Sequence, residues 1–267
     1  LPIFGIGAGS NIPGARGYSV SWKDSQENFW LFGGYAVDSS GMTGDLNDLW
    51  KFDGTNWIWI SGGRTVRQPG VYGTKGVSVF SNMPGARDSS HAWIDGANRL
   101  WLFGGYGVDQ SGLAGDLNDL WNFDGMNWTW VSGGSARTQV GSYGTKGIIS
   151  SSNTPGARDS GSTWVDSSNN LWLMGGFGLD ANGNAGSLND LWKFNGSDWV
   201  WISGSSFKNQ RGVYGTQGTM ELVTLPGSRG YGAHWMDSNN TLWIFGGYGI
   251  DANGVSNDLN DLWSYSR

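Results

Sequence analysis

Short apolar runs separated by polar, glycine-rich stretches recur along the whole chain. Residues 100–103 form a continuous run of Leu, Trp, Leu and Phe that ends at two glycines. Residues 128–131 alternate instead, with two tryptophans two positions apart. A short continuous run is typical of a buried β-strand, and a period of two is typical of a strand with one buried face. The pattern therefore predicts strands and no helices.

Residues 84–154 contain four such strands. Turn signals at Asp95-Gly96 and Asp124-Gly125 join the first strand to the second and the third to the fourth, while a long polar loop joins the second to the third. Strands joined in this way form an antiparallel four-stranded sheet. The predicted strands are residues 89–93, 100–103, 120–123 and 128–131.

The same sheet is encoded four times at a step of 71 residues. Pro-Gly-Ala-Arg begins at Pro13, Pro84 and Pro155, and Pro-Gly-Ser-Arg begins at Pro226. Each copy must bury its apolar face against its neighbours, so the repeat predicts a single all-β domain over residues 1–267. The repeats are residues 13–83, 84–154, 155–225 and 226–267.

Four-stranded sheets repeated in this way predict a β-propeller of four blades. Each copy has an apolar run before Gly-Gly, then Asn-Asp-Leu-Trp, and an aromatic residue two positions later, at Phe52, Phe123, Phe194 and Tyr265. In this combination the chain resembles the kelch-repeat family over all four copies, although a kelch repeat has about 50 residues. The resemblance implies kelch-like blades. Antiparallel order places both long loops of each blade on one face, where we expect ligand binding.

The fourth copy ends after its third strand, without the Trp-x-Trp strand of the other copies. Residues 1–12 precede the first repeat and are apolar enough to form a closing strand. We expect this segment to complete the fourth blade, because a tethered strand has a high effective concentration. The alternative is its donation to a neighbouring molecule, a strand exchange that would build filaments. The apolar residues of this closing or donor strand are Ile3, Phe4 and Ile6.

The composition of the chain limits the classes of partner, the metal sites and the cellular location that we expect. The formal net charge is −6, which argues against nucleic acid as a partner. No apolar run reaches the length of a membrane-spanning helix, so we expect no membrane insertion. The absence of cysteine excludes disulfides, thiolate catalysis and cysteine-based metal sites. A weakly charged chain rich in Trp, Gly and Asn favours an extracellular or cell-surface location.

Tryptophan is abundant, and an exposed tryptophan is a common stacking platform for sugars. All 18 tryptophans fall on five repeat positions, so we interpret them as framework that packs within and between blades. A lectin with one weak site per blade would have to use the outward member of a Trp-x-Trp pair or the aromatic residues of the long loops. The candidate ligand-binding loop residues are Tyr72, Tyr143 and Tyr214.

The loop between the second and third strands is rich in Asp, Asn and Gly in every copy. Such oxygen ligands suit calcium, which is the one cofactor we consider, but no Glu closes the loop as it does in an EF-hand. We favour the alternative, in which Asp and Asn side chains cap the turns. The candidate metal ligands are Asp38, Asp45, Asp109, Asp116, Asp180, Asp251 and Asp258.

Each copy also places one arginine at the start of its innermost strand. We expect these residues to pair with repeated aspartates, because a buried arginine without a partner is costly. The arginines are Arg16, Arg87, Arg158 and Arg229, and the aspartates are Asp48, Asp119, Asp190 and Asp261.

Catalytic residues are not evident. His91 and His234 occupy different repeat positions, and we identify no carboxylate pair or nucleophile that interrupts the repeat. The galactose oxidase branch of the kelch fold depends on a cysteine that this chain lacks. The sequence therefore predicts a non-enzymatic extracellular module that binds a protein or glycan ligand or acts as a scaffold, with a lectin and a filament subunit as alternatives.

Overall fold

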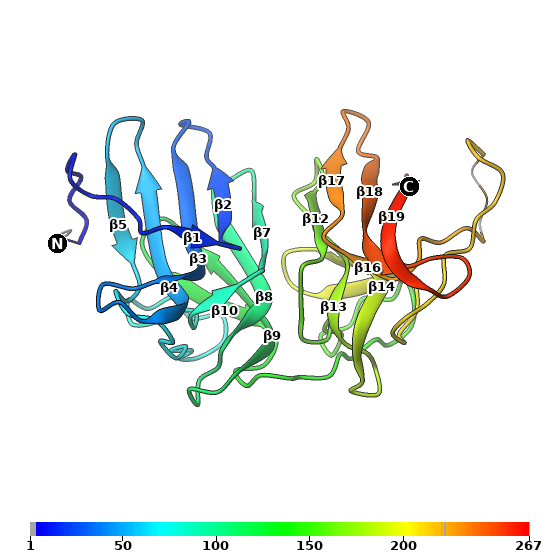
Figure 1. Cartoon of the computed structure of the whole chain (residues 1–267), viewed down its shortest axis with the longest axis horizontal. Coiled ribbons are helices and arrows are strands. Elements are labelled where there is room, and N and C mark those ends of the chain that lie inside the picture. The colour runs from blue at the N-terminus through cyan, green and yellow to red at the C-terminus, as the bar shows by residue number, and fades with distance from the viewer. Residues whose placement is uncertain (1–3, 220, 222, 267) are drawn as a thin grey trace. The chain divides into compact units, whose positions relative to one another are not determined.

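The protein is built from β-strands. The computed structural model describes residues 4–219, 221 and 223–266, and this part of the chain forms four antiparallel sheets without a helix (Figure 1). No helix that could span a membrane occurs among these residues. The predicted fold class, an all-β propeller of four blades, is confirmed.

The chain divides into two compact units, residues 1–137 and 138–267, and each is described by itself. A single domain over the whole chain stays a prediction.

Unit 1 contains the first two sheets, and each has the order that the repeat predicts. The first sheet consists of β1 (Arg16–Gly17), β2 (Val20–Lys23), β3 (Phe29–Val37), β4 (Thr43–Phe52) and β5 (Trp57–Ser61). The second consists of β6 (Arg87–Asp88), β7 (His91–Ile94), β8 (Leu100–Val108), β9 (Ala114–Phe123) and β10 (Trp128–Ser132).

The predicted first strand of each blade is interrupted. In the first blade it is split into β1 and β2, which both pair with β3, and Tyr18 between them has a positive φ of 57°. Ser89 has the same conformation between β6 and β7, with φ of 49°. Because such a conformation is unfavourable for residues with a side chain, it marks a fixed break in the strand.

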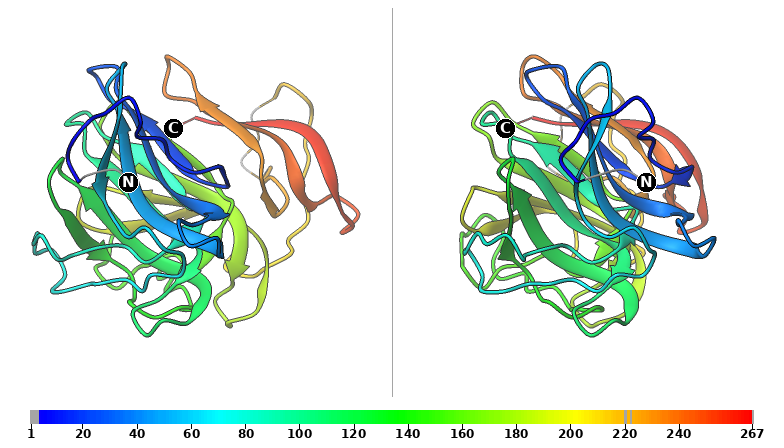
Figure 2. Two further views of the ribbon diagram at one scale, coloured as in Figure 1. Left: turned by 60° about the vertical axis from the view of Figure 1, so that its left-hand side comes forward. Right: turned by 90° about the vertical axis from the view of Figure 1, so that its left-hand side faces the viewer.

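Unit 2 contains the third and fourth sheets, and the fourth is one strand shorter. The third consists of β11 (Arg158–Asp159), β12 (Ser162–Val165), β13 (Leu171–Leu179), β14 (Ala185–Phe194) and β15 (Trp199–Ser203). The fourth consists of β16 (Arg229–Gly230), β17 (Ala233–Met236), β18 (Leu242–Ile250) and β19 (Ser256–Tyr265). Within the described residues of this unit, β19 pairs only with β18 and forms the edge of its sheet (Figures 1 and 2).

Tryptophans form much of each core, as the framework interpretation predicts. The largest fully buried side chains include Trp121 and Trp128 in unit 1 and Trp192 and Trp199 in unit 2. Trp235, on β17, is an exception because it is exposed and stacks on Trp243.

The predicted arginine–aspartate pairs are present in all four blades. In the second blade, Nη1 and Nη2 of Arg87 donate hydrogen bonds to Oδ1 and Oδ2 of Asp119, both at 2.7 Å, and neither side chain is exposed. Arg87 also donates to the carbonyl oxygens of Gly85 and Gly104. Two-pronged contacts of this kind satisfy a guanidinium that has lost its water. The equivalent pairs are Arg16–Asp48, Arg158–Asp190 and Arg229–Asp261.

The prediction that the N-terminal segment completes the fourth blade is wrong in this structure, where the described part of the segment lies along β5 of the first blade. Gly5 N–H donates to the carbonyl of Trp59 at 2.9 Å, and Asn11 donates to that of Trp57 at 3.1 Å. Gly76 and Asn82 make the same two contacts with β10. The segment thus repeats the end of the long interblade loop.

The apolar residues of this segment do not form a closing strand. Phe4 packs edge-on against Trp59 with the ring centroids 5.7 Å apart, Ile6 is exposed, and Ile3 lies outside the described residues. The physical reason is the repeat register. Asn11 holds the same repeat position as Asn82, and each asparagine bonds to the last strand of a blade, so the segment lies where the interblade loop of the next repeat lies.

Candidate functional site

The loop tyrosines lie against the buried ion pairs. Tyr72 and Tyr143 are buried, and their hydroxyls donate to Asp119 and Asp190 at 2.6 and 2.7 Å. Tyr214 makes the equivalent bond to Asp261 but is 47% exposed. Burial leaves the first two rings no free face for a ligand.

Most loop aspartates cap turns, which confirms the interpretation that we favoured. In the first blade, Asp38 accepts hydrogen bonds from the N–H groups of Ser40, Met42 and Val66. A hydrogen bond from the Ser40 hydroxyl, together with these bonds from N–H groups, lowers the pKa of Asp38 to about 2. Asp109, Asp180 and Asp251 accept equivalent bonds within their own loops.

The other three candidate metal ligands lie on the strands that follow these loops. Asp116 is half-buried opposite Tyr106, Asp258 is exposed opposite Tyr248, and Asp45 is buried. In the part of the chain that the structure describes, no three residues of the types His, Cys, Asp and Glu form a group that could hold a metal.

Asp45 and Asp88 form a carboxyl pair that the sequence did not lead us to expect. Asp45 lies on β4 of the first blade and Asp88 on β6 of the second, and β6 packs against β3 and β4. Their side chains lie within hydrogen-bonding reach of each other, and a bond between two carboxyl groups forms only when one of them carries a proton. Asp45 is buried, whereas Asp88 is half-buried and is the member of the pair that solvent reaches.

The environment of Asp45 favours its protonated form. Burial and the neighbouring charge of Asp88 raise the pKa of Asp45 to about 7, and the charge of Arg67 offsets this only in part. Within the described residues, Oδ1 of Asp45 accepts no hydrogen bond from an N–H or hydroxyl group. A carboxyl group in these surroundings retains its proton close to neutral pH, which is the property of a general acid.

Exposed tyrosines stand beside the pair. Tyr35 lies opposite Asp45 in the register of β3 and β4, and Tyr106 lies opposite Asp88 in the register of β6 and β8. Directly opposed residues of an antiparallel pair project from the same face, about 4.5 to 5.5 Å apart. Tyr35 is 48% exposed and Tyr106 is 44% exposed. The arrangement places a proton donor next to two rings that a ligand can contact.

The repeat held a signal for this site that a search for regular positions overlooks. Asp88 occupies a position that is glycine in the first and fourth copies, at Gly17 and Gly230. Asp45 is itself a repeated aspartate, but the third copy has Ser187 instead. The third copy retains an aspartate at the position of Asp88, at Asp159, so this position separates the two inner copies from the two outer ones.

The raised pKa predicts a pH-dependent effect of Asp45→Asn on stability. A group whose pKa is higher in the folded state stabilises the protein below its unfolded pKa, near 3.8, and this contribution is lost as the pH rises to about 7. We expect the variant to gain about 1 to 3 kcal/mol over the wild type across this range, the usual cost of a poorly compensated buried polar group. Thermal melts at unit steps from pH 4 to 8 measure the difference.

The matched control for this prediction is Asp258→Asn, which changes the exposed aspartate at the same repeat position. Its melting temperature should follow that of the wild type at every pH. A flat difference between Asp45→Asn and the wild type from pH 4 to 8 would contradict the raised pKa.

Comparison with known proteins gives fold likeness without sequence likeness. No protein-family model matches the chain, and no curated protein matches it. Solved structures do match. An endo-arabinase from Bacteroides thetaiotaomicron is 12% identical, with 97% of this chain and 79% of that chain covered and a TM-score of 0.43.

Two further solved structures extend this comparison. A GH43 β-1,3-galactosidase is 7% identical, with 88% and 68% covered and a TM-score of 0.44. The structure of YjhT is 13% identical, with 93% and 81% covered and a TM-score of 0.48. At these identities the likeness concerns the fold alone.

The predictions of a non-enzymatic module and of no enzyme activity are corrected by this comparison. Two of the similar structures, the endo-arabinase and the β-1,3-galactosidase, are enzymes that act on carbohydrate. The sequence prediction compared positions within single repeats and did not consider carboxyl groups from two adjacent repeats, such as Asp45 and Asp88.

Proposed function

We propose that the protein is an enzyme that cleaves glycosidic bonds, with the Asp45–Asp88 pair as its proton-transfer group. The observation that supports this proposal is the carboxyl pair itself, which retains a proton and lies beside two exposed tyrosines. Structural carboxylates are normally paired with a cation or a set of amides, as Asp119 and Asp38 are in this chain. Two carboxyl groups in contact do not stabilise the fold as an ion pair does, and such pairs with a shifted pKa are typical of sites of acid–base catalysis.

The substrate that fits this site is a neutral glycan. Tyrosine rings are amphipathic and contact the C–H face of a sugar ring while their hydroxyls remain in water. Tyr35 lies opposite Asp45 and Tyr106 lies opposite Asp88, so both rings are placed for such contacts beside the pair. A net charge of −6 disfavours a polyanionic substrate.

The chemistry follows from the single shared proton. The pair donates its proton to the glycosidic oxygen as the bond to the anomeric carbon breaks. A water molecule adds to that carbon and gives up its own proton, which restores the pair. Asp88 contacts the substrate, and Asp45 holds the proton in place. The two carboxyl groups act as one acid–base unit, because separate acid and nucleophile groups lie about 5 Å or more apart.

The test is the release of reducing ends from a panel of neutral polysaccharides, including arabinan, galactan, xylan and β-glucan, at pH 5 to 8. We expect the wild type to cleave at least one of them, and Asp88→Asn to cleave none at a comparable rate. Equal release by the two proteins, or no release from any substrate, would contradict the proposal.

Three further expectations from the sequence accompany this proposal. The Gly-Gly and Asn-Asp-Leu-Trp segments support a relationship with kelch repeats, and the weakly charged composition supports an extracellular location. Because the turn amides already occupy Asp38, Asp109, Asp180 and Asp251, we propose that the activity needs no calcium. Equal rates with and without EDTA would agree with this.

A further inference from the structure

Unit 2 carries three neighbouring aromatic rings, which we call the aromatic platform: Phe177 on β13, Tyr248 on β18, and Tyr231 directly after β16. The centroid of the Phe177 ring lies 5.6 Å from that of Tyr231 and 6.3 Å from that of Tyr248. Tyr231 is 61% exposed and Tyr248 is 44% exposed, whereas Phe177 is half-buried. Single exposed apolar side chains are common, but neighbouring exposed rings form a patch of the kind that contacts a ligand.

The platform occupies the place in unit 2 that the carboxyl pair occupies in unit 1. At a distance of two repeats, the counterparts of Asp45 and Asp88 are Ser187 and Gly230. β16 packs against β13 and β14 as β6 packs against β3 and β4, so the two places are built in the same way. Neither Ser187 nor Gly230 is acidic, and the shared proton of unit 1 therefore has no equivalent at this place.

The glycine at position 230 makes room for the platform. A Cβ atom at this position would come within 2.6 Å of the Phe177 ring, so the ring packs directly on the Gly230 backbone. The next residue, Tyr231, donates its N–H to the carbonyl of Ser160 at 2.9 Å, which joins the fourth blade to the third. The rings are therefore positioned before a ligand arrives, which lowers the entropic cost of binding.

The exposure of these rings is not imposed by the framework. Tyr106 holds the repeat position of Tyr248 in the second blade, which has all its strands, and is also 44% exposed. Serine holds the position of Tyr231 in the second and third blades, at Ser89 and Ser160, with a left-handed φ in each case. The backbone at this position therefore does not require an aromatic side chain.

The polar group beside the platform suits a neutral sugar. Asp258 is exposed and lies opposite Tyr248 in the register of β18 and β19, so the two side chains project from the same face. A carboxylate accepts hydrogen bonds from sugar hydroxyls, while a tyrosine ring covers the apolar C–H face of the sugar. The same carboxylate repels an anionic sugar.

We propose that the aromatic platform of unit 2 is a non-catalytic binding site for a neutral glycan, separate from the Asp45–Asp88 pair. The choice of ligand rests on the proposed function, whereas the place of the site rests on the ring contacts of Phe177, Tyr231 and Tyr248. The platform contributes affinity for the polymer and takes no part in proton transfer.

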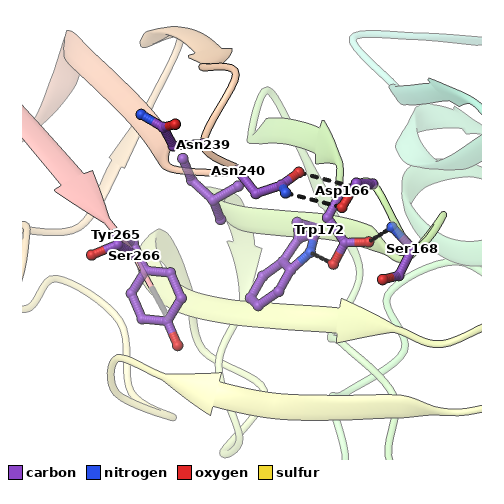
Figure 3. A pocket seen from close by; sticks show the side chains of 9 residues that line it. Asp166, Ser168, Trp172, Asn239, Asn240, Tyr265 and Ser266 are labelled. Atoms are coloured by element: carbon purple, nitrogen blue, oxygen red, sulfur yellow. Dashed lines mark hydrogen bonds between the residues drawn. The ribbon is translucent and has the colours of Figure 1, made fainter.

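A pocket near the other end of β18 is the competing place for a sugar in unit 2. Its walls include Trp172, Leu242 and Tyr265 (Figure 3). Leu242 begins β18 and lies roughly 20 Å along the strand from Tyr248, so a ligand in the pocket does not cover the platform. Tyr265→Ala removes an aromatic wall of the pocket and is the matched control for the platform variants.

The test measures the binding of arabinan, galactan, xylan and β-glucan by affinity gel electrophoresis, with every protein carrying Asp88→Asn so that the polymers stay intact. We expect at least one polymer to retard the protein. Tyr248→Ala and Tyr231→Ser should each raise the dissociation constant about tenfold, because each removes a stacking ring. Tyr248→Phe and Tyr265→Ala should bind as tightly as the parent protein.

Tyr231→Ser keeps the test decisive if Tyr248→Ala does not fold, because serine already occupies this position in two other blades. The inference is overturned if no polymer retards the protein, or if Tyr35→Ala or Tyr265→Ala weakens binding while the platform variants do not. A protein that cleaves a polymer but binds it without Tyr248 retains the proposed function and loses this inference. A protein that cleaves nothing but binds through Tyr248 does the reverse.

Discussion

Arg87→Met is expected to lower the free energy of unfolding by about 3 to 5 kcal/mol. The substitution keeps most of the volume of the side chain but leaves the carboxylate of Asp119 buried without its counter-charge. The carbonyl oxygens of Gly85 and Gly104 lose a donor as well. Tyr72 and Trp121 still donate to Asp119, but two neutral donors do not replace a guanidinium.

Urea denaturation followed by tryptophan fluorescence measures this effect. The matched control is Lys23→Met, which removes the cation of an exposed pair with Glu27 and should change stability by less than about 1 kcal/mol. The double variant Arg87→Met with Asp119→Leu should recover much of the loss, because no buried charge remains. Equal stability of Arg87→Met and Lys23→Met would contradict the role assigned to the pair.

The four blades could be predicted because their signal is local and repeated. The apolar run that becomes β8 and the alternating run that becomes β10 each contain their own evidence for a strand. The arginine–aspartate pairs could be predicted for a related reason, since a buried charge needs a partner at a matching repeat position. These inferences need no knowledge of how neighbouring blades approach each other.

The position of the N-terminal segment depends on such an approach. Apolar composition suggested a strand, but the hydrogen bonds of Gly5 and Asn11 to β5 decide where the segment lies. The repeat offered the clue, because Asn11 aligns with Asn82 and Asn153 at the end of the long loops. Alignment of the segment with the loops predicts its place better than hydrophobicity does.

The carboxyl pair depends on tertiary contact in the same way. Asp45 and Asp88 belong to adjacent copies, and only the packing of β6 against β4 brings them together. Nothing in the spacing of either aspartate within its own repeat predicts this contact. The available signal was the aspartate at this position in the second and third copies, Asp88 and Asp159, because the first and fourth copies have glycine there and a charge in its place needs an explanation.

Asp88→Asn is expected to reduce glycan cleavage by about 100-fold to 10,000-fold, the usual contribution of a general acid or base. Asparagine retains the shape of the side chain and its hydrogen bond to Asp45, but it cannot exchange the proton with the substrate. The melting temperature of the variant should therefore stay close to that of the wild type while its kcat falls. Initial rates on the best substrate of the polysaccharide panel, measured alongside thermal melts, separate these two quantities.

The dependence of the cleavage rate on pH tests whether the Asp45–Asp88 pair supplies the proton. Because the pKa of Asp45 is raised to about 7, the wild-type rate should fall as the pH rises beyond that value and the pair loses its proton. Asp258→Asn, at the same repeat position as Asp45, should retain both the rate and the profile of the wild type. If Asp88→Asn cleaves the substrate at the wild-type rate, and its rate still falls above about pH 7 as the wild-type rate does, the Asp45–Asp88 pair does not supply the proton for cleavage.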